Sequence, residues 1–566
     1  MPSTKKVPPF KNETYVDFSD PAIRRLQEKA LAQVTRKLGK EYPLMIAGKK
    51  VYTKDWIESR NPAHPTQVIG RFAEGTRKLV DEAITKAAAA FEDWKQWSPE
   101  DRADILFKAA QICRDRRYEI NAWMILEVGK NWPEADADTA EGIDFLEYYG
   151  RQMLSLAGPQ PVVPNKGEKG YLEYLPLGVG LVIPPWNFPF AILLGTTAAA
   201  LVTGNTVVLK PSSDSPMMGW LAYEILLQAG LPKNALTFFA SPGGEVGDAL
   251  VKHPLTRFVS FTGSKQVGLR INQNAAEPQK GQKWIKRVVA EMGGKDAIVV
   301  AKDADLDEAA DGIVAAAFGF QGQKCSACSR AIIEKPIYNK MLAKIVERVH
   351  QIDIGDPIDN MRMGPVVSER AYKTIQEYIK IGKKEARLIA GGDVLQADGY
   401  YIEPTVFADV APDARIAQEE IFGPVLAIIP AKNYDEALEI ANNTEFGLTG
   451  AVYTKSRKNL ERAEKEFFVG NLYLNRKCTG ALVGVHPFGG FNMSGTDSKA
   501  GGPDYLHLFL QPKSVAEKIV TSSKRTRATS RKSPSRNGKS ASRNGKSPSA
   551  SRKNVTNMKR KVRGGF

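Results

Sequence analysis

The sequence predicts an α/β protein with two lobes, each containing a doubly wound parallel sheet. From 179 to 292, short apolar runs of strand length alternate with longer segments of helical spacing, the rhythm of repeated βαβ units. A second and less regular series begins at Ala297 and ends near 491. The chain has 566 residues, which is enough for several such units.

The N-terminal part predicts a polar arm, short strands and then long helices. A helix is expected from Pro21 to about Leu38, and we interpret residues 1–40 as packing outside the core. Short alternating strands are expected within 45–72. Amphipathic spacing predicts helices over 77–96, from Pro99 onward and over about 135–155, the second preceded by the capping residue Ser98.

The first βαβ series predicts strands at 179–183, 206–210, 236–240, 257–262 and 288–292, with helices at 190–202, 216–229, 244–252 and 265–274. The segment 175–209 has no charged residue and is long enough to cross a bilayer. Four prolines and Asn187 interrupt any continuous helix there, so we interpret it as a buried strand, loop, helix and strand.

The second series predicts a strand at 297–300 and a helix that Asp305 caps, with Glu308 three residues later. A strand at 330–334 and a helix at 337–352 follow. The hairpin pattern at 160–175 stands outside both series, and such a hairpin is expected to extend toward a neighbouring molecule.

Positive charge is concentrated at the C-terminus. The net charge is +16, but 15 of the 79 Lys and Arg residues and none of the 63 acids lie in 521–566, which leaves 64 − 63 = +1 for the rest. This tail repeats Ser-Arg-Asn-Gly-Lys-Ser and has few apolar residues, so it is expected to be disordered. Polyanion binding, nucleic-acid binding, a membrane-surface tether and a simple solvated tail all remain open, although aromatic stacking is disfavoured.

The four cysteines, at 113, 325, 328 and 478, are too few for a disulfide framework. Cys325 and Cys328 form a CxxC, but neither a second pair nor a nearby His gives zinc-binding spacing, so no metal is expected. The first ten residues lack the apolar core of a secretory signal. These features predict a reducing compartment, the cytoplasm, and no transmembrane segment.

Polar residues follow several of the predicted strands. Asn187, between prolines, is either a turn residue or an amide donor to a developing oxyanion. Lys210 is either solvated or a donor to ribose or phosphate. Gly263 and Ser264 begin a helix, where an anion can bind, although the GxGxxG pattern is absent.

Three further residues are candidates for catalysis or ligand binding. Glu291 ends a strand before two glycines and is either a general base or a solvent-facing acid. Glu420 is either a ribose ligand or part of a turn. Cys325 follows a Gly-rich turn after a helical segment, and it is either a nucleophile or an inert apolar filler.

Six segments in this order resemble the aldehyde dehydrogenase superfamily: 185–189, 210–211, 261–264, 291–295, 322–325 and 420–424. The resemblance covers about 40–520. It implies a homo-oligomer, at least a dimer, and an aldehyde dehydrogenase-like fold. Its expected parts are an N-terminal arm (1–40), an NAD(P)-binding domain (41–159 and 176–290), a catalytic domain (291–491), an oligomerisation arm (160–175 and 492–520) and the basic tail (521–566).

The resemblance also implies roles for individual residues. Cys325 is the expected nucleophile, Glu291 the base, and Asn187 the oxyanion donor beside the backbone N–H of Cys325. Expected cofactor contacts are Lys210 and Glu420 at ribose, Phe422 at the nicotinamide, Ser264 at the pyrophosphate, and Pro185, Trp186, Ser213 and Gly263 nearby. Ser213 stands where the family often has Glu, which disfavours a 2′-phosphate, so this chain is expected to accept NADP as well as NAD. NAD is still the favoured cofactor.

The stretches 318–330 and 475–490 resemble the glutamate-semialdehyde (1-pyrroline-5-carboxylate) dehydrogenases within that superfamily. This resemblance implies oxidation of the semialdehyde to glutamate in proline catabolism and a functional link to a proline dehydrogenase. Ser326, Gly480 and Ala481 would hold the amino-acid end, Phe188 and Phe488 would flank the stem, and Cys328 and Cys478 would be structural. It further implies that the 160–175 hairpin pairs near a partner's strand at 513–520. A broader aliphatic or other semialdehyde dehydrogenase remains the alternative.

Overall fold

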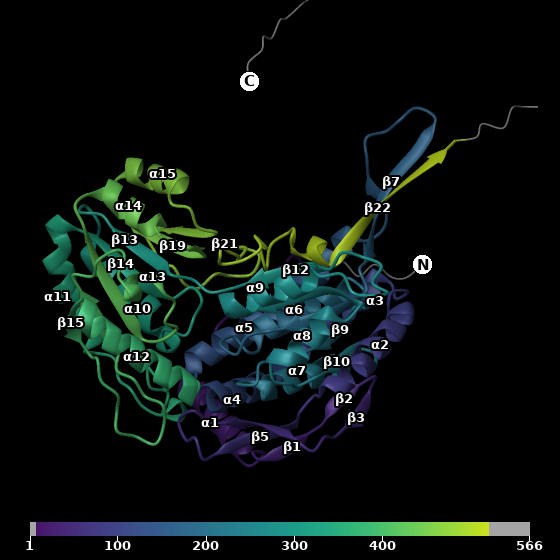
Figure 1. The fold of residues 1–566 in the computed structure, drawn as a ribbon, viewed down its shortest axis with the longest axis horizontal. Coiled ribbons are helices and arrows are strands. Elements are labelled where there is room, and N and C mark those ends of the chain that lie inside the picture. Colours follow the sequence, from purple (N-terminus) through teal and green to yellow (C-terminus); the bar gives the residue numbers. More distant parts are fainter. Residues whose placement is uncertain (1–6, 520–566) are drawn as a thin grey trace, which may run out of the picture.

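The structure, a computed structural model, describes residues 7–519. Two lobes face each other, each organised around a seven-stranded sheet with helices packed against it (Figure 1). A narrow arm projects from the first lobe (Figure 1). The architecture is therefore the α/β fold expected from the two βαβ series.

The sheet of the first lobe has the order β12-β11-β8-β9-β10-β2-β3. Its first five strands are parallel, and β2 and β3 are added antiparallel at one edge. The strands are β12 (Arg287–Glu291), β11 (Thr256–Thr262), β8 (Val179–Ile183), β9 (Thr206–Leu209), β10 (Leu236–Phe238), β2 (Leu44–Ile46) and β3 (Lys49–Val51). A small sheet of β1 (Lys40–Tyr42), β5 (Val68–Ala73) and β4 (Trp56–Arg60) lies beside it.

The helices of this lobe are α1 (Pro21–Thr35), α2 (Arg77–Trp94), α3 (Pro99–Asp115), α4 (Arg117–Val128), α5 (Trp132–Leu156), α6 (Ala191–Val202), α7 (Pro216–Gln228), α8 (Gly244–Lys252) and α9 (Lys265–Ala276). As expected, Ser98 caps α3 by accepting a hydrogen bond from Asp101 N. The sequence did not predict α4, which is buried along nearly its whole length and so lacks an amphipathic pattern. The segment 175–209 folds as β8, a proline-rich loop, α6 and β9, and among residues 7–519 no helix is long and apolar enough to cross a membrane.

The sheet of the second lobe has the order β15-β16-β17-β14-β13-β19-β20 and is parallel except for β15. Its strands are β15 (Arg387–Ala390), β16 (Thr405–Ala408), β17 (Val425–Ala431), β14 (Cys328–Glu334), β13 (Asp296–Val300), β19 (Thr449–Tyr453) and β20 (Asn471–Leu474). Its helices are α10 (Leu306–Phe318), α11 (Tyr338–Val349), α12 (Glu369–Glu385), α13 (Arg415–Gln418), α14 (Tyr434–Asn442) and α15 (Arg457–Glu466).

Short elements complete this lobe and its connections: η1 (Gly319–Gly322), η2 (Lys335–Ile337), η3 (Pro357–Asp359), η4 (Tyr505–Phe509), and the paired strands β18 (Phe446–Gly447) and β21 (Phe491–Asn492). Asp305 caps α10 as predicted, since its carboxylate accepts from the N–H groups of Asp307 and Glu308.

The projecting arm corrects one prediction. It consists of β6 (Gln160–Pro161), β7 (Glu168–Pro176) and β22 (Leu510–Lys518). We expected the hairpin to pair with a partner's C-terminal strand, but β7 pairs antiparallel with β22 of its own chain, in a register that places Glu173 opposite Lys513. The pairing is continuous along both nine-residue strands, and β6 pairs along the other edge of β7, so β7 is the central strand of the arm and β22 is an edge strand.

The N-terminal arm corrects a second prediction. Residues 1–40 were interpreted as lying outside the core, yet Phe18, Leu31 and Val34 belong to the principal hydrophobic core of the first lobe. The polar composition of α1 did not reveal this burial, because only a narrow stripe of the helix is buried. The predicted basic tail, 521–566, lies outside the described residues.

Candidate active site

Cys325 follows a tight turn at the end of α10. Phe320, Gln321 and Gly322 all have left-handed backbone angles, with φ of 49°, 56° and 67°. Two successive non-glycine residues in this region are strained, so other contacts must hold them. Gln321 Nε2 donates to the carbonyl oxygens of Pro365 (2.6 Å) and Gly129 (3.2 Å), and Gln323 Oε1 accepts from Val367 N (2.9 Å). The turn that presents the thiol is therefore fixed by buried amides.

Asn187 lies on the proline-rich loop after β8 and is almost completely buried. Its Nδ2 donates to Gln323 O at 3.1 Å, and its Oδ1 accepts from Phe188 N. The structure thus brings Asn187 to the turn that precedes Cys325, where its amide is oriented from both sides. This is the neighbourhood that an oxyanion donor for Cys325 must occupy.

A buried ion pair supports the same loop. Lys130 and Asp138 are both inaccessible to solvent and lie 2.6 Å apart, and Asp138 also accepts from Ala191 N at the start of α6. The Lys130 ammonium lies 4.2 Å from the ring centre of Phe188 and 4.7 Å from that of Phe320. One cation therefore links the Asn187 loop to the nucleophile turn through two cation–π contacts.

Glu291 ends β12 and reaches the same region. Burial raises its pKa to about 8, and the hydroxyl of Ser498, which donates to Oε1, lowers the pKa in part. Its other oxygen has no hydrogen-bond partner among residues 7–519. Burial, and then the negative charges of Asp296 and Glu420, raise the pKa of the Cys325 thiol well above its usual value. Both groups are thus protonated at rest near neutral pH.

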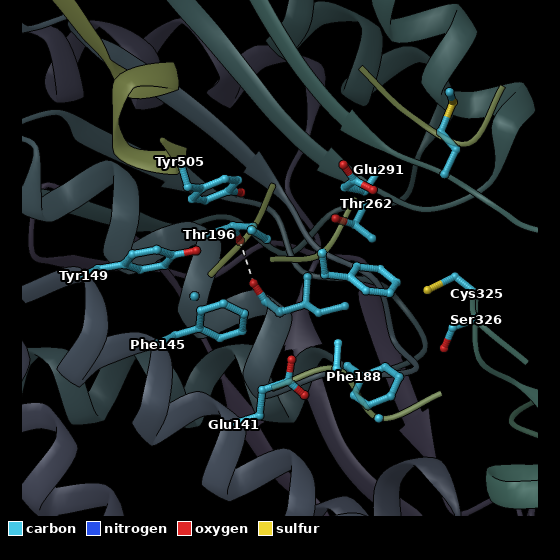
Figure 2. A pocket seen from close by; sticks show the side chains of 17 residues that line it. Glu141, Phe145, Tyr149, Phe188, Thr196, Thr262, Glu291, Cys325, Ser326 and Tyr505 are labelled. Carbon is cyan, nitrogen blue, oxygen red and sulfur yellow. Dashed lines mark hydrogen bonds between the residues drawn. The ribbon is translucent and has the colours of Figure 1, made fainter. Parts of the chain in front are cut away.

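A cavity of about 110 Å³ opens beside Cys325 (Figure 2). All five predicted substrate residues line it: Phe188, Ser326, Gly480, Ala481 and Phe488. Figure 2 shows Cys325 and Ser326 on one side and the aromatic rings of Phe145, Tyr149 and Tyr505 on the other. The mostly apolar walls suit an aliphatic stem.

The loop that carries Gly480 is held from outside the cavity. Gly480 has a left-handed φ of 78°, and Arg476 Nη2 donates to the carbonyl oxygens of Thr479 (2.9 Å) and Gly480 (3.0 Å). Alternating backbone handedness turns successive N–H groups to one side, which creates an anion site. Buried Cys478 donates from Sγ to Ser326 O at 3.4 Å, so this loop is joined to the nucleophile segment.

Cys325 also lines a larger cavity, of about 510 Å³. Every predicted cofactor residue lines it: Pro185, Trp186, Lys210, Ser213, Gly263, Ser264, Glu420 and Phe422. Ser264 caps α9, so the N-terminus of that helix faces this space. Trp186 and Phe422 meet edge to face, with ring centres 5.5 Å apart.

The charged groups of this second cavity are strongly desolvated. Burial lowers the pKa of Lys210 to about 8 and raises that of Glu420 to about 7. Glu420 Oε1 accepts from Gly294 N at 3.0 Å, and a side chain at Gly293 would overlap the carboxylate. A buried ammonium, a buried carboxylate and an open helix N-terminus fit the hydroxyls and phosphates of a dinucleotide.

The family model for the aldehyde dehydrogenase family matches residues 50–515. The chain belongs to this family. It is 58% identical to the 1-pyrroline-5-carboxylate dehydrogenase of Geobacillus thermodenitrificans over 512 residues, 90% of this chain and 99% of the relative.

Two solved structures resemble this aldehyde dehydrogenase over most of its length. A 1-pyrroline-5-carboxylate dehydrogenase from Thermus with bound NAD has a TM-score of 0.89 and 49% identity, covering 91% of this chain and 100% of that one. Proline utilization A from Bdellovibrio bacteriovorus has a TM-score of 0.89 and 43% identity, covering 91% of this chain and 54% of that one.

The cavity of this aldehyde dehydrogenase also contains polar groups that the sequence did not indicate. Glu141 on α5 points into it, and Thr196 on α6 lies nearby (Figure 2). Burial raises the pKa of Glu141 to about 8. Nothing in the sequence distinguishes Glu141 from the five other acids of α5, which are Glu134, Asp136, Asp138, Asp144 and Glu147.

Proposed function

We propose that the chain oxidises L-glutamate γ-semialdehyde, the open form of 1-pyrroline-5-carboxylate, to L-glutamate with NAD. One observation carries this proposal. Cys325 stands in the wall shared by two cavities, one fit for a dinucleotide and one lined by Ser326, Gly480 and Ala481. The 58% identity to a 1-pyrroline-5-carboxylate dehydrogenase and the NAD-bound Thermus structure support it.

In the first half-reaction, the Cys325 thiol gives its proton to solvent water, and its sulfur bonds to the aldehyde carbon. The C=O bond becomes a single bond, and the Asn187 amide stabilises the resulting oxyanion. NAD, when bound, is the oxidant that takes up the hydrogen of this carbon with its electron pair. Cys325 then holds the acyl group as a thioester. One oxyanion donor is worth about 3–4 kcal/mol in the transition state.

In the second half-reaction, Glu291 removes a proton from water, and the water oxygen bonds to the thioester carbon. The carbon–sulfur bond breaks, the released thiolate takes the proton from Glu291 to regenerate the thiol, and the carboxylic acid leaves. Only ionised Glu291 can act in this way. Its pKa of about 8 therefore makes turnover rise with pH through this range.

Recognition of the amino-acid end needs one anion site and one counter-charge for the ammonium. We assign the anion site to Ser326 and the Gly480–Ala481 turn, and the counter-charge to Glu141. A bound ammonium would favour the ionised carboxylate and so lower the pKa of Glu141. Phe188 and Phe488 line the same cavity, and we assign their rings to contact with the aliphatic stem.

The experiment compares kcat/KM for L-glutamate γ-semialdehyde with kcat/KM for propanal. We expect the semialdehyde to be preferred by at least about 100-fold, since two charged-group contacts are lost in propanal. Equal values would overturn the assignment in favour of a broad aliphatic aldehyde dehydrogenase. Cys325→Ala should abolish turnover of both substrates, at least about 10³-fold, while leaving NAD binding in place.

Several wider features belong to the same proposal. The reaction needs a supplier that oxidises proline at the ring carbon–nitrogen bond, which is a proline dehydrogenase, and the likeness to proline utilization A supports this link. The four free cysteines support a reducing compartment, and we propose the cytoplasm. We also propose a homo-oligomer that uses the arm, and the domain limits given above.

A second function, polyanion binding, is favoured by the 15 positive charges and the absence of acids in 521–566. We expect the full chain to bind double-stranded DNA with an affinity that falls steeply as salt rises. Removing 521–566 should abolish that binding and leave turnover unchanged. Loss of turnover in the shortened chain would place the tail in catalysis instead.

A further inference from the structure

Residues 7–18, here called the N-terminal strap, run along α5 of the first lobe. The Pro8 carbonyl oxygen accepts from Arg151 Nε at 2.9 Å, and Val16 N donates to Asp136 Oδ2 at 3.0 Å. Between these points, Arg117 Nη2 donates to Thr14 O at 2.8 Å. The strap is therefore hydrogen-bonded to α4 and, at both ends, to α5, the helix that carries Glu141.

Asn12 is the centre of this strap. Its Nδ2 donates to Asp144 Oδ2 at 2.8 Å and to Val483 O at 3.0 Å. The backbone N–H of the next residue, Glu13, donates to Asp144 Oδ1 at 2.7 Å. One side-chain amide thus joins α5, whose Asp144 is 132 residues later in the chain, to the loop 479–484, whose Val483 is 471 residues later.

Both elements that Asn12 joins are walls of the substrate cavity. Asp144 lies one helical turn after Glu141, and Val483 lies three residues after Gly480 on the same loop. Phe10 adds an apolar contact, since its ring packs edge to face on Tyr148 of α5 at 5.2 Å and covers Gly484. The strap therefore fixes the spacing between Glu141 and the Gly480–Ala481 turn.

We propose that Asn12 is a positioning residue for substrate recognition, which holds the anion-binding turn at the distance from Glu141 that an α-amino acid end requires. This inference rests on the proposed function. Asn12 touches neither substrate nor cofactor, and it acts through the loop and the helix that it joins. An aldehyde without charged groups does not depend on that spacing.

The test measures Asn12→Ala in the full chain with two substrates. We expect KM for L-glutamate γ-semialdehyde to rise about ten-fold, the effect of losing roughly one net hydrogen bond to a charged group. We expect kcat with this substrate, and kcat/KM with propanal, to change less than about two-fold, as for substitutions away from the reacting atoms. Lys11→Ala, an exposed neighbour in the strap, is the matched control and should change neither substrate.

A second readout does not depend on the substrate. Amide hydrogen exchange in the peptide that spans 479–485 should be faster in Asn12→Ala than in the wild type and in Lys11→Ala, because the loop loses its tie to α5. Asn12→Asp, which sets a carboxylate against Asp144, should have a larger effect on both readouts than Asn12→Ala.

Unchanged exchange in 479–485, or an equal loss with both substrates, would overturn the positioning role. If the wild type itself does not prefer the semialdehyde, the proposed function fails, and faster loop exchange in Asn12→Ala would still support the tie between the strap and the loop. The two failures are thereby distinguishable.

Discussion

The two cavities that meet at Cys325 are built in different ways. The cofactor cavity is made from the ends of parallel strands and the loops directly after them, with glycines where the backbone approaches closely. The substrate cavity is made from the sides of α5 and α6, the rings of Phe145, Tyr149 and Tyr505, and the loop from 479 to 484. A dinucleotide site therefore follows from sheet topology, whereas the substrate site depends on how helices and distant loops pack.

After loss of the nucleophile itself, the largest effect is expected at the loop between the cavities. Asn187→Ala should reduce kcat by about 10²- to 10³-fold with little change in either KM, because its amide acts on the oxyanion that forms in the transition state. Steady-state kinetics with both substrates measure this. A change confined to KM would show that Asn187 only shapes the cavity and does not stabilise the oxyanion.

A smaller effect, restricted to the substrate side, is expected for Glu141→Gln. The amide cannot balance the substrate ammonium, so kcat/KM for the semialdehyde should fall by about 10- to 100-fold. Propanal turnover and the Kd of NAD should not change. Glu82→Gln on the exposed face of α2 is the control. A parallel loss with propanal would contradict the assignment of Glu141 as the counter-charge.

On the cofactor side, Ser213→Glu should lower kcat/KM for NADP by about ten-fold or more and leave NAD unchanged, because a carboxylate repels the 2′-phosphate. Asp214 and Arg370 line the same part of the cavity, 3.7 Å apart, and the charge of Arg370 partly offsets that repulsion. Ser213→Ala serves as the neutral control. Equal losses of kcat/KM with NAD and with NADP would show that the adenosine ribose does not lie beside residue 213.

The smallest effect is a displaced pH profile. The Ser498 hydroxyl lowers the pKa of Glu291. Ser498→Ala should therefore raise this pKa above about 8, and the rising limb of kcat against pH should move to higher pH. Turnover of Ser498→Ala should therefore be lower than that of the wild type near pH 7.5 and should recover at higher pH. A pre-steady-state burst of NADH followed by slow turnover would show that the slowed step is deacylation. A rising limb of kcat that moves to lower pH would contradict the prediction.

The same contrast explains what could be predicted from the sequence. Strands such as β8 and β11 have clear patterns, and parallel strands place their carboxyl ends at one edge, so Asn187, Lys210 and Glu291 were expected to lie at one edge of the sheet. That Cys325 joins them was implied by the family resemblance. The fold class and the family are confirmed by the comparisons. The roles of individual residues stay predictions.

The parts that were missed depend on tertiary packing. Helix α4 is buried on all sides and has no periodic signal. Glu141 is identified only once α5 packs beside α6, and Asn12 only once the strap crosses from Asp144 to Val483. The partner of β22 was wrong because strand pattern does not specify which neighbouring strand completes the pairing.

The arm also determines where the chain leaves the folded body. Strand β22 pairs with β7 out to Lys518, opposite Glu168, and Ile519 N donates to Gly167 O at the hairpin turn. The arm projects away from both lobes (Figure 1). A fluorophore or solid support attached through Lys518 would therefore sit on the arm and not on either lobe, which makes the arm the natural handle for immobilising an enzyme that stays open to aldehyde and dinucleotide.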